Sequence, residues 1–102
     1  MLDFIKKLFG PGVDIKDVYS KGATIIDVRT TGEYSSGHIK DSINIPLDSV
    51  NSNFDKIKNM KQPIITCCAS GMRSGSAKNM LKSKGLEAYN GGGWASLNQK
   101  IK

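Results

Sequence analysis

The chain has 102 residues, of which 38% are hydrophobic and 24% are charged. This length predicts a single domain, and the composition excludes an intrinsically disordered chain. No apolar run approaches the ~18 residues of a membrane span, and residues 1–10 lack both the apolar stretch and the cleavage site of a secretory signal. We therefore expect a cytoplasmic protein with no membrane partner.

The elements expected along the chain alternate between helices and strands. In the first half of the chain, we expect a short amphipathic helix at 2–9, a helix at 15–20 that Asp14 caps and Gly22 ends, and strands at 23–28 and 43–45. An interrupted helix at 47–60 follows. After it we expect a strand at 64–67, a helix at 74–84, a strand at 87–89 and a helix from Trp94. This alternation predicts one α/β domain over residues 1–102, with a mostly parallel sheet of four to five strands and helices on both faces. Its core would span about 12–102, with 1–11 as an extension or short helix.

The net charge of +6 is unevenly distributed between the two halves of the chain. Residues 1–54 carry a net charge of −1 and residues 55–102 a net charge of +7. The lysines are scattered and form no basic run, so we do not expect nucleic acid as a partner. A small anion or an acidic partner protein fits the second half of the chain better.

The two cysteines, Cys67 and Cys68, are neighbours in the chain. A disulfide between neighbours is strained and crosslinks nothing, which excludes a secreted disulfide scaffold. Two cysteines and one distant histidine also cannot form a structural zinc site, and we expect no metal. The remaining interpretations are chemistry at a thiol or burial of two small side chains.

The segment after the strand at 64–67 is typical of an anion-binding loop. A strand that ends in cysteine leads through a Ser/Gly loop into a helix, at the sheet edge where α/β folds bind ligands. Loop N–H groups, the helix N-terminus and Arg73 would surround the Cys68 sulfur, and Gly71 permits a left-handed turn. Such a cradle favours the nucleophilic thiolate. The alternative is a buried cysteine beside an ordinary turn.

The spacing leaves two possible starts for this loop. Counted from Cys68 the pattern is C-x4-R, and counted from Cys67 it is C-x5-R, the spacing of cysteine-based phosphatases. Strand alternation hides one of the two sulfurs, but the register is not visible in the sequence. The residues alone do not choose between the two.

Two motifs resemble the rhodanese (thiosulfate sulfurtransferase) homology family, in particular its small single-domain members. The first combines Asp27-Val-Arg29, Glu33-Tyr34, Gly37-His38-Ile39 and Asn44-Ile45-Pro46, the second is the loop from Cys68 to Ser74, and Gly92-Gly93 matches as well. The family's six-residue loop, C-x-x-G-x-R, has its glycine in place only if it starts at Cys68. The family commonly has a tryptophan where this chain has Leu97, a departure that concerns C-terminal packing.

The resemblance implies sulfur transfer through a Cys68 persulfide. Thiosulfate or another persulfide or polysulfide would donate the sulfur, and a thiol, cyanide or a protein in a sulfur relay would accept it, with no cofactor. Arg73 would bind the anionic substrate, and the rest of the loop would line the site: Ala69, Ser70, Gly71, Met72 and Ser74. The positive excess belongs to the half of the chain that builds this cradle, where we expect it to attract thiosulfate or an acidic relay protein. The alternatives are a persulfide carrier or interaction module, and a phosphatase or arsenate reductase.

Four further residues of the first motif are expected to support the fold. Arg29 and Glu33 lie four apart, at ion-pair spacing if residues 30–35 form a helical turn. Asp27 would make structural hydrogen bonds at the end of its strand, and His38 would fix its own loop. Cys67 is expected to be buried.

Overall fold

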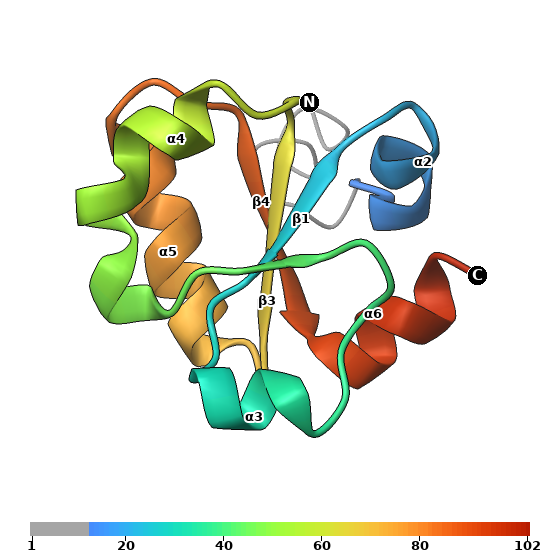
Figure 1. Cartoon of the computed structure of the whole chain (residues 1–102). Coiled ribbons are helices and arrows are strands. Elements are labelled where there is room, and N and C mark those ends of the chain that lie inside the picture. Colours follow the sequence, from blue (N-terminus) through green and yellow to red (C-terminus); the bar gives the residue numbers. More distant parts are fainter. Residues whose placement is uncertain (1–12) are drawn as a thin grey trace.

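The computed structural model describes residues 13–102, and the short helix predicted at 2–9 lies outside them. Four strands form one sheet: β1 (Thr24–Asp27), β2 (Ile43–Asn44), β3 (Ile64–Cys68) and β4 (Ala88–Gly93). All neighbouring strands are parallel, in the order β2-β1-β3-β4 (Figure 1). The predicted α/β class with a parallel sheet is confirmed, and the sheet has four strands.

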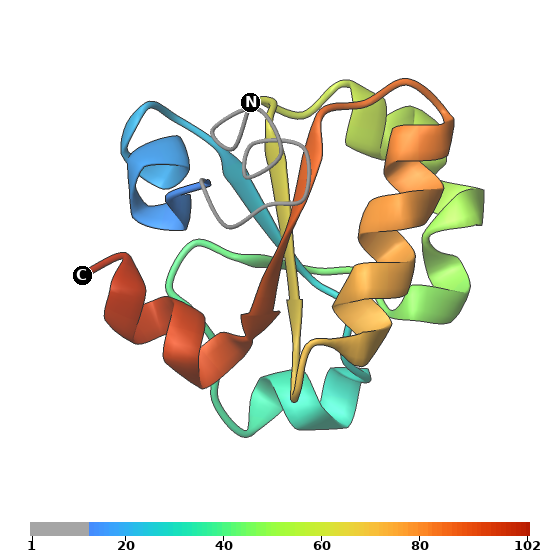
Figure 2. The same ribbon diagram turned by 180° about the vertical axis from the view of Figure 1, so that it is seen from behind.

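Helices cover both faces of the sheet. They are α2 (Ile15–Ser20), α3 (Thr31–Ser35), α4 (Phe54–Lys58), α5 (Met72–Ser83) and α6 (Trp94–Lys100), with short 3₁₀ helices η1 (Leu47–Ser49) and η2 (Asn51–Asn53). Figures 1 and 2 show α4 and α5 on one face, α2 and α6 on the other, and α3 at the carboxyl edge of the strands. Within residues 13–102, no helix has the length and apolar character needed to cross a bilayer.

Two predicted elements differ from the structure. The interruption expected in the helix over 47–60 is present, but residues 47–53 form the 3₁₀ helices η1 and η2 and only α4 is an α-helix. The Ser52 and Asn53 side chains donate hydrogen bonds to the Ser49 carbonyl and compete with regular helical pairing. The strand expected at 87–89 continues through Gly93. The glycine run 91–93 therefore belongs to β4, and Gly93 pairs with Cys68 at the end of β3.

Strand alternation divides the core into two layers. Ile26 and Ile64 pack with Cys68 under α4 and α5, whereas Ile25 and Cys67 pack with the core beneath α2 and α6. Successive strand residues point to opposite faces, so the two cysteine side chains lie on opposite sides of the sheet. The register that the sequence left open is thereby fixed.

Candidate active site

The Cys68 sulfur lies inside the turn that joins β3 to α5. It accepts a hydrogen bond from the Gly71 N–H at 2.9 Å and one from the Ser74 N–H at 3.4 Å. The Ser74 Oγ is also 3.4 Å away. Gly71 adopts φ 106°, the left-handed conformation expected there, and this turns its N–H inward at the start of α5. Two of the backbone N–H groups expected in the cradle therefore donate to the Cys68 sulfur.

The two cysteines have opposite electrostatic environments, although both are fully buried. Burial on its own raises the pKa of Cys68, but the hydrogen bonds from the Ser74 side chain and from the Ser74, Gly71 and Ser70 N–H groups outweigh it and lower the pKa. Burial, together with the negative charge of Asp27, raises the pKa of Cys67 to about 12. The thiolate is therefore easier to form at Cys68 than at Cys67.

The glycines of β4 form the wall behind the loop. A Cβ on Gly93 would lie 2.8 Å from the Ala69 carbonyl oxygen, and one on Gly71 would lie 3.4 Å from the Gly92 Cα. The loop and the strand end therefore pack backbone against backbone. Ser70 lies exposed on the loop, and the Met72 residue is 83% exposed on its outer side.

Arg73 forms a two-point ion pair with Glu33. Its Nη1 and Nη2 donate to the two carboxylate oxygens of Glu33 at 2.7 and 3.0 Å. Glu33 is fixed in turn by the N-terminal capping box of α3, where it accepts a hydrogen bond from the Thr30 N–H. The Arg73 hydrogen bonds, with those from Thr30, lower the pKa of Glu33 to about 2. Glu33 thus joins α3 to the cysteine loop.

The ion pair expected between Arg29 and Glu33 is wrong. The helical turn predicted at 30–35 exists as α3, but Arg29 precedes its N-cap, so the helical i,i+4 geometry does not apply to this pair. Arg29 instead donates from Nε and Nη2 to the Asp27 carboxylate, at 2.7–3.0 Å, in a buried pair. It also donates to the Glu33 and Gly37 carbonyls. These contacts hold α3 and the following loop against the end of β1.

Three further residues singled out in the sequence, His38, Leu97 and Trp94, are not among the hydrogen-bond partners of the Cys68 sulfur. His38 is exposed, its ring stacks on Tyr34 at 3.7 Å between centroids, and its Nδ1 lies 2.8 Å from the Tyr34 carbonyl oxygen. Leu97, the departure from the family pattern, is fully buried in the layer that contains Cys67. Trp94 packs under the Arg29 guanidinium, and the Arg29 Cζ lies 4.8 Å from the centroid of the Trp94 ring.

One residue at the site was missed by the sequence analysis. Asn90 of β4 accepts a hydrogen bond from the Ser74 hydroxyl at 2.7 Å and donates one to the Gly71 carbonyl at 3.0 Å. The only signal in the sequence is a polar residue directly before the glycine run. Only the β3–β4 pairing places it beside the loop.

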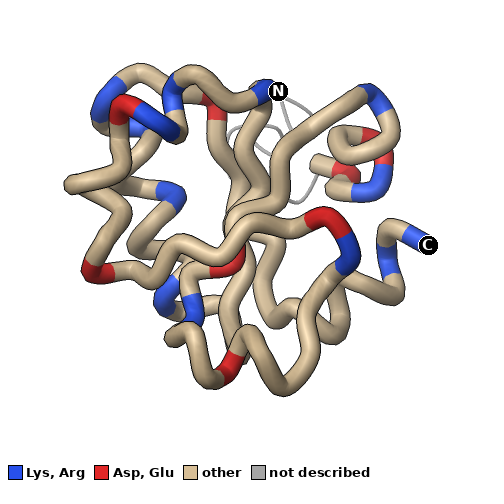
Figure 3. Tube along the Cα trace, in the orientation of Figure 1, with Lys and Arg blue, Asp and Glu red and all other residues tan. Residues whose placement is uncertain are grey.

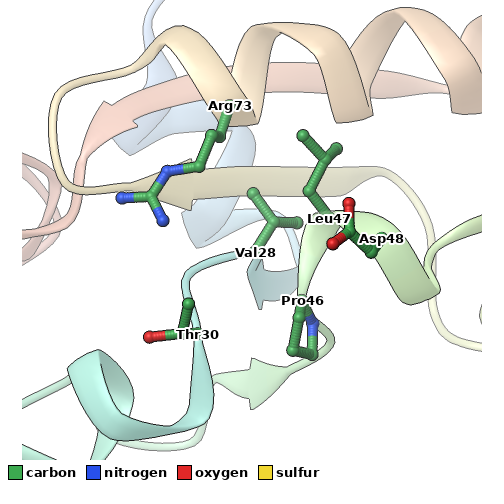
Figure 4. A pocket seen from close by; sticks show the side chains of 6 residues that line it. All are labelled: Val28, Thr30, Pro46, Leu47, Asp48 and Arg73. Atoms are coloured by element: carbon green, nitrogen blue, oxygen red, sulfur yellow. The ribbon is translucent and has the colours of Figure 1, made fainter.

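A small hollow of about 120 Å³ opens beside Arg73. Its lining consists of Val28, Thr30, Pro46, Leu47, Asp48 and Arg73. Figure 4 shows the Arg73 side chain extending from the start of α5 on one side of Val28, with Leu47 and Asp48 on the other side. Val28 directly follows Asp27, which pairs with Cys67, so this part of the lining continues from the end of β1 beside β3.

Most lysines in the second half of the chain lie away from the cysteine loop. Most lysines of the second half lie on α4, at the end of α5 and in the loop before β3, at the amino edge of the sheet (Figure 3). They are Lys56, Lys58, Lys61, Lys82 and Lys84. The twelve-residue α5 is ~18 Å long and separates its C-terminal lysines from the loop at its N-terminus. Within residues 13–102, no cluster of three or more His, Cys, Asp or Glu side chains could hold a metal ion.

Comparison with known proteins decides the family. The model of the rhodanese-like domain matches residues 14–100. This chain belongs to the rhodanese-like domain family. The resemblance drawn from the two sequence motifs is thereby confirmed.

Similar curated proteins include sulfurtransferases. The chain is 32% identical to a tRNA sulfurtransferase of Thermoplasma acidophilum over 76% of its length, and 38% identical to the uncharacterized protein YqhL of Bacillus subtilis over 78%. It spans only 15% and 64% of the lengths of these two relatives. It is also 31% identical to the thiosulfate sulfurtransferase GlpE of Pseudomonas syringae, over 65% of this chain and 61% of GlpE.

Solved structures of this family share the fold. A rhodanese-related protein from Thermoplasma volcanium superimposes with a TM-score of 0.71 at 32% identity, covering 86% of this chain and 90% of its own. A rhodanese with anions from E. coli gives a TM-score of 0.66 at 30% identity, covering 72% of this chain and 89% of its own. The single α/β domain with helices on both faces is thus the rhodanese-like fold.

Proposed function

We propose that this protein is a sulfurtransferase that carries sulfur as a persulfide on Cys68. The Cys68 thiolate attacks the outer sulfur of thiosulfate, a new S–S bond forms, and the S–S bond of thiosulfate breaks with its electron pair leaving on sulfite. A nucleophile such as cyanide or a thiol then attacks the outer sulfur of the persulfide. The bond to the Cys68 sulfur breaks, and the thiolate returns.

The observation that carries this proposal is the set of donors around one sulfur. The Gly71 and Ser74 N–H groups point at Cys68 Sγ, at 2.9 and 3.4 Å, where the thiolate charge lies before transfer. Each step begins and ends with an anion in this loop, so prearranged N–H dipoles stabilise the whole cycle. The α5 N-terminus adds partial positive charge in the same place.

We assign substrate binding to Arg73 and to the exposed side of the loop. A guanidinium has five N–H groups, and two of those on Arg73 bind Glu33, which leaves three for an anionic donor. The negative charge of Cys68 contributes to the raised pKa of Arg73, after the larger effect of Glu33. In this proposal Glu33 orients the guanidinium, and Ala69, Ser70 and Met72 form the surface that the substrates approach.

A second candidate is a persulfide carrier that receives sulfur from a partner protein. The observation that favours it is Met72, which is 83% exposed on the active-site loop and offers an apolar contact to a partner protein. A phosphatase or arsenate reductase is disfavoured, because a loop that starts at Cys67 would use a buried thiol with a pKa of about 12. The proposal includes a cytoplasmic location, where a reactive thiol stays reduced.

Mass spectrometry after incubation with thiosulfate tests the proposal. We expect a mass increase of roughly 32 Da, one sulfur atom as the covalent intermediate, on Cys68. The adduct should be absent in Cys68→Ser, present in Cys67→Ser, and lost when cyanide is added. An adduct that forms only with a protein persulfide donor would select the carrier, and an adduct on Cys67 alone would overturn the assignment.

A further inference from the structure

The side chain of Asn90 links two residues that hydrogen-bond with the Cys68 sulfur, Gly71 and Ser74. Its Nδ2 donates to the Gly71 carbonyl at 3.0 Å, and the N–H of the same glycine donates to Cys68 Sγ at 2.9 Å. Its Oδ1 accepts the Ser74 hydroxyl at 2.7 Å, and that hydroxyl oxygen lies 3.4 Å from Sγ. Both paths to the sulfur therefore start at one amide.

The orientation of this amide is determined by its partners. Oδ1 also accepts the Gly92 N–H at 2.9 Å, whereas Nδ2 faces a carbonyl oxygen. A flipped amide would place its NH₂ against an N–H and its oxygen against the Gly71 carbonyl, and both contacts would be lost. Asn90 Oδ1 is therefore an acceptor, and the Ser74 hydroxyl is the donor between them.

The Ser74 hydroxyl has one proton and two possible acceptors. While its proton points to Asn90, the oxygen presents a lone pair to Cys68 and can accept the S–H of the thiol. When Cys68 loses its proton, the hydroxyl can turn its own proton to the sulfur, and Asn90 Oδ1 keeps the Gly92 N–H. The Ser74 hydroxyl and the Asn90 amide thus accommodate both the thiol and the thiolate of Cys68. In either state, no buried group loses all its hydrogen-bond partners.

We infer that Asn90 is a positioning residue for the Cys68 thiolate, holding the Gly71 peptide in place and sharing the Ser74 proton with the sulfur. This role rests on the proposed function only because it takes the thiolate as the reactive form of Cys68. Asn90 is exposed on the edge strand β4, while Ser74 is fully buried. Substitutions at Asn90 can therefore alter the loop without opening the core.

Other ionisable groups lie on the elements around the cysteine loop. Arg73 on α5 and Cys67 on β3 interact electrostatically with Cys68. Asp27 lies on β1 opposite Cys67, and Asp48 lines the neighbouring hollow on η1. On β4, the Tyr89 hydroxyl donates to Glu87, before the strand begins. All these groups remain unchanged in the variants below.

The test is the pH dependence of iodoacetamide alkylation at Cys68 in Asn90→Asp, read by site-resolved mass spectrometry. The carboxylate keeps an acceptor for Ser74 but has no N–H for the Gly71 carbonyl, and it holds the Ser74 proton more strongly. We expect the pKa of Cys68 to rise by about one unit, so that alkylation at pH values below it slows about tenfold. The matched control is Asn79→Asp on the exposed side of α5, which should change the rate by less than about twofold.

A double variant separates the proposed route from a distant charge effect. In the Ser74→Ala background, Asn90→Asp should shift the midpoint by less than half as much as in the wild-type background. Equal shifts in both backgrounds would overturn the sharing of the Ser74 proton, and equal midpoints for Asn90→Asp and Asn79→Asp would overturn the role as a whole. Alkylation needs no sulfur donor, so a chain that forms no persulfide would refute the proposed function and leave this result standing.

A measurement on the unsubstituted protein keeps the inference testable if Asn90→Asp does not fold. The side-chain NH₂ resonances of Asn90 should titrate in NMR spectra with the same midpoint as the Gly71 amide. Those of Asn79 should not respond. Asn90 resonances that stay constant across the Cys68 midpoint would contradict the inference.

Discussion

The sharpest test of the site compares the reactivity of the two cysteines in the unsubstituted protein. Cys67 and Cys68 are adjacent and both fully buried, so sequence position and solvent exposure do not distinguish them. Their hydrogen-bond partners do. Gly71 and Ser74 donate to Cys68, whereas Cys67 faces the negative charge of Asp27. Only the thiolate reacts with iodoacetamide, so the rate ratio reports this difference.

The expected ratio follows from the two thiol pKa values. A pKa of about 12 leaves Cys67 roughly 0.01% ionised at pH 8. The pKa of Cys68 lies below the ordinary 9.0, so at least about 9% of it is thiolate at that pH. The thiolate fractions differ by at least about a thousandfold. Because Cys68 borders a surface loop and Cys67 lies between two helices and the sheet, local opening increases the ratio further.

The assay is alkylation of the folded protein at pH 8, with the modified peptide sequenced by tandem mass spectrometry. We expect label on Cys68 and essentially none on Cys67 until a denaturant unfolds the chain, when both react at similar rates. The denatured sample is the internal control for peptide detection. Comparable labelling of the two cysteines in the folded protein would refute the electrostatic division between them.

Three substitutions test the roles of other residues. Arg29→Ala leaves the buried Asp27 carboxylate without its cation, and we expect a loss of ~3–5 kcal/mol in unfolding free energy, measured by urea titration. Arg73→Ala should leave the folded state in place, because Arg73 is half-buried. It should lower kcat/KM for thiosulfate at least about tenfold. An equal kinetic loss in a folded Arg29→Ala would contradict this division of roles. Gly71→Ala forces a side chain into φ 106° at a cost of ~1–3 kcal/mol, and it should raise the midpoint of Cys68 alkylation. An unchanged midpoint would show that the Gly71 N–H does not stabilise the thiolate.

The elements that the sequence predicted well are those with local causes. Asp14 accepts the N–H groups of Lys16 and Asp17 and starts α2 at the predicted residue. Buried β-branched runs produced β1 and β3, and Gly71 took the positive φ expected of it. The least accurate predictions were at the Asn-rich segment after η1 and at the β4 glycines, where backbone pairing depends on distant neighbours.

The sequence by itself determined the chemistry available to this protein. A cysteine at the end of a buried strand, a glycine three residues later and a helix after it are sufficient to predict an anion cradle, because each effect acts over a few neighbouring residues. The two motifs also identified the family. These conclusions needed no knowledge of which segments meet in space.

Only the tertiary structure decided which partners complete the site. Sheet register turned Cys67 and Cys68 to opposite faces, and the parallel pairing of β3 with β4 brought Asn90 to Ser74. The packing of α3 at the carboxyl edge joined Glu33 to Arg73, forty residues away. These contacts depend on how strands and helices align across the sheet. The short-range patterns of the chain do not specify that long-range alignment.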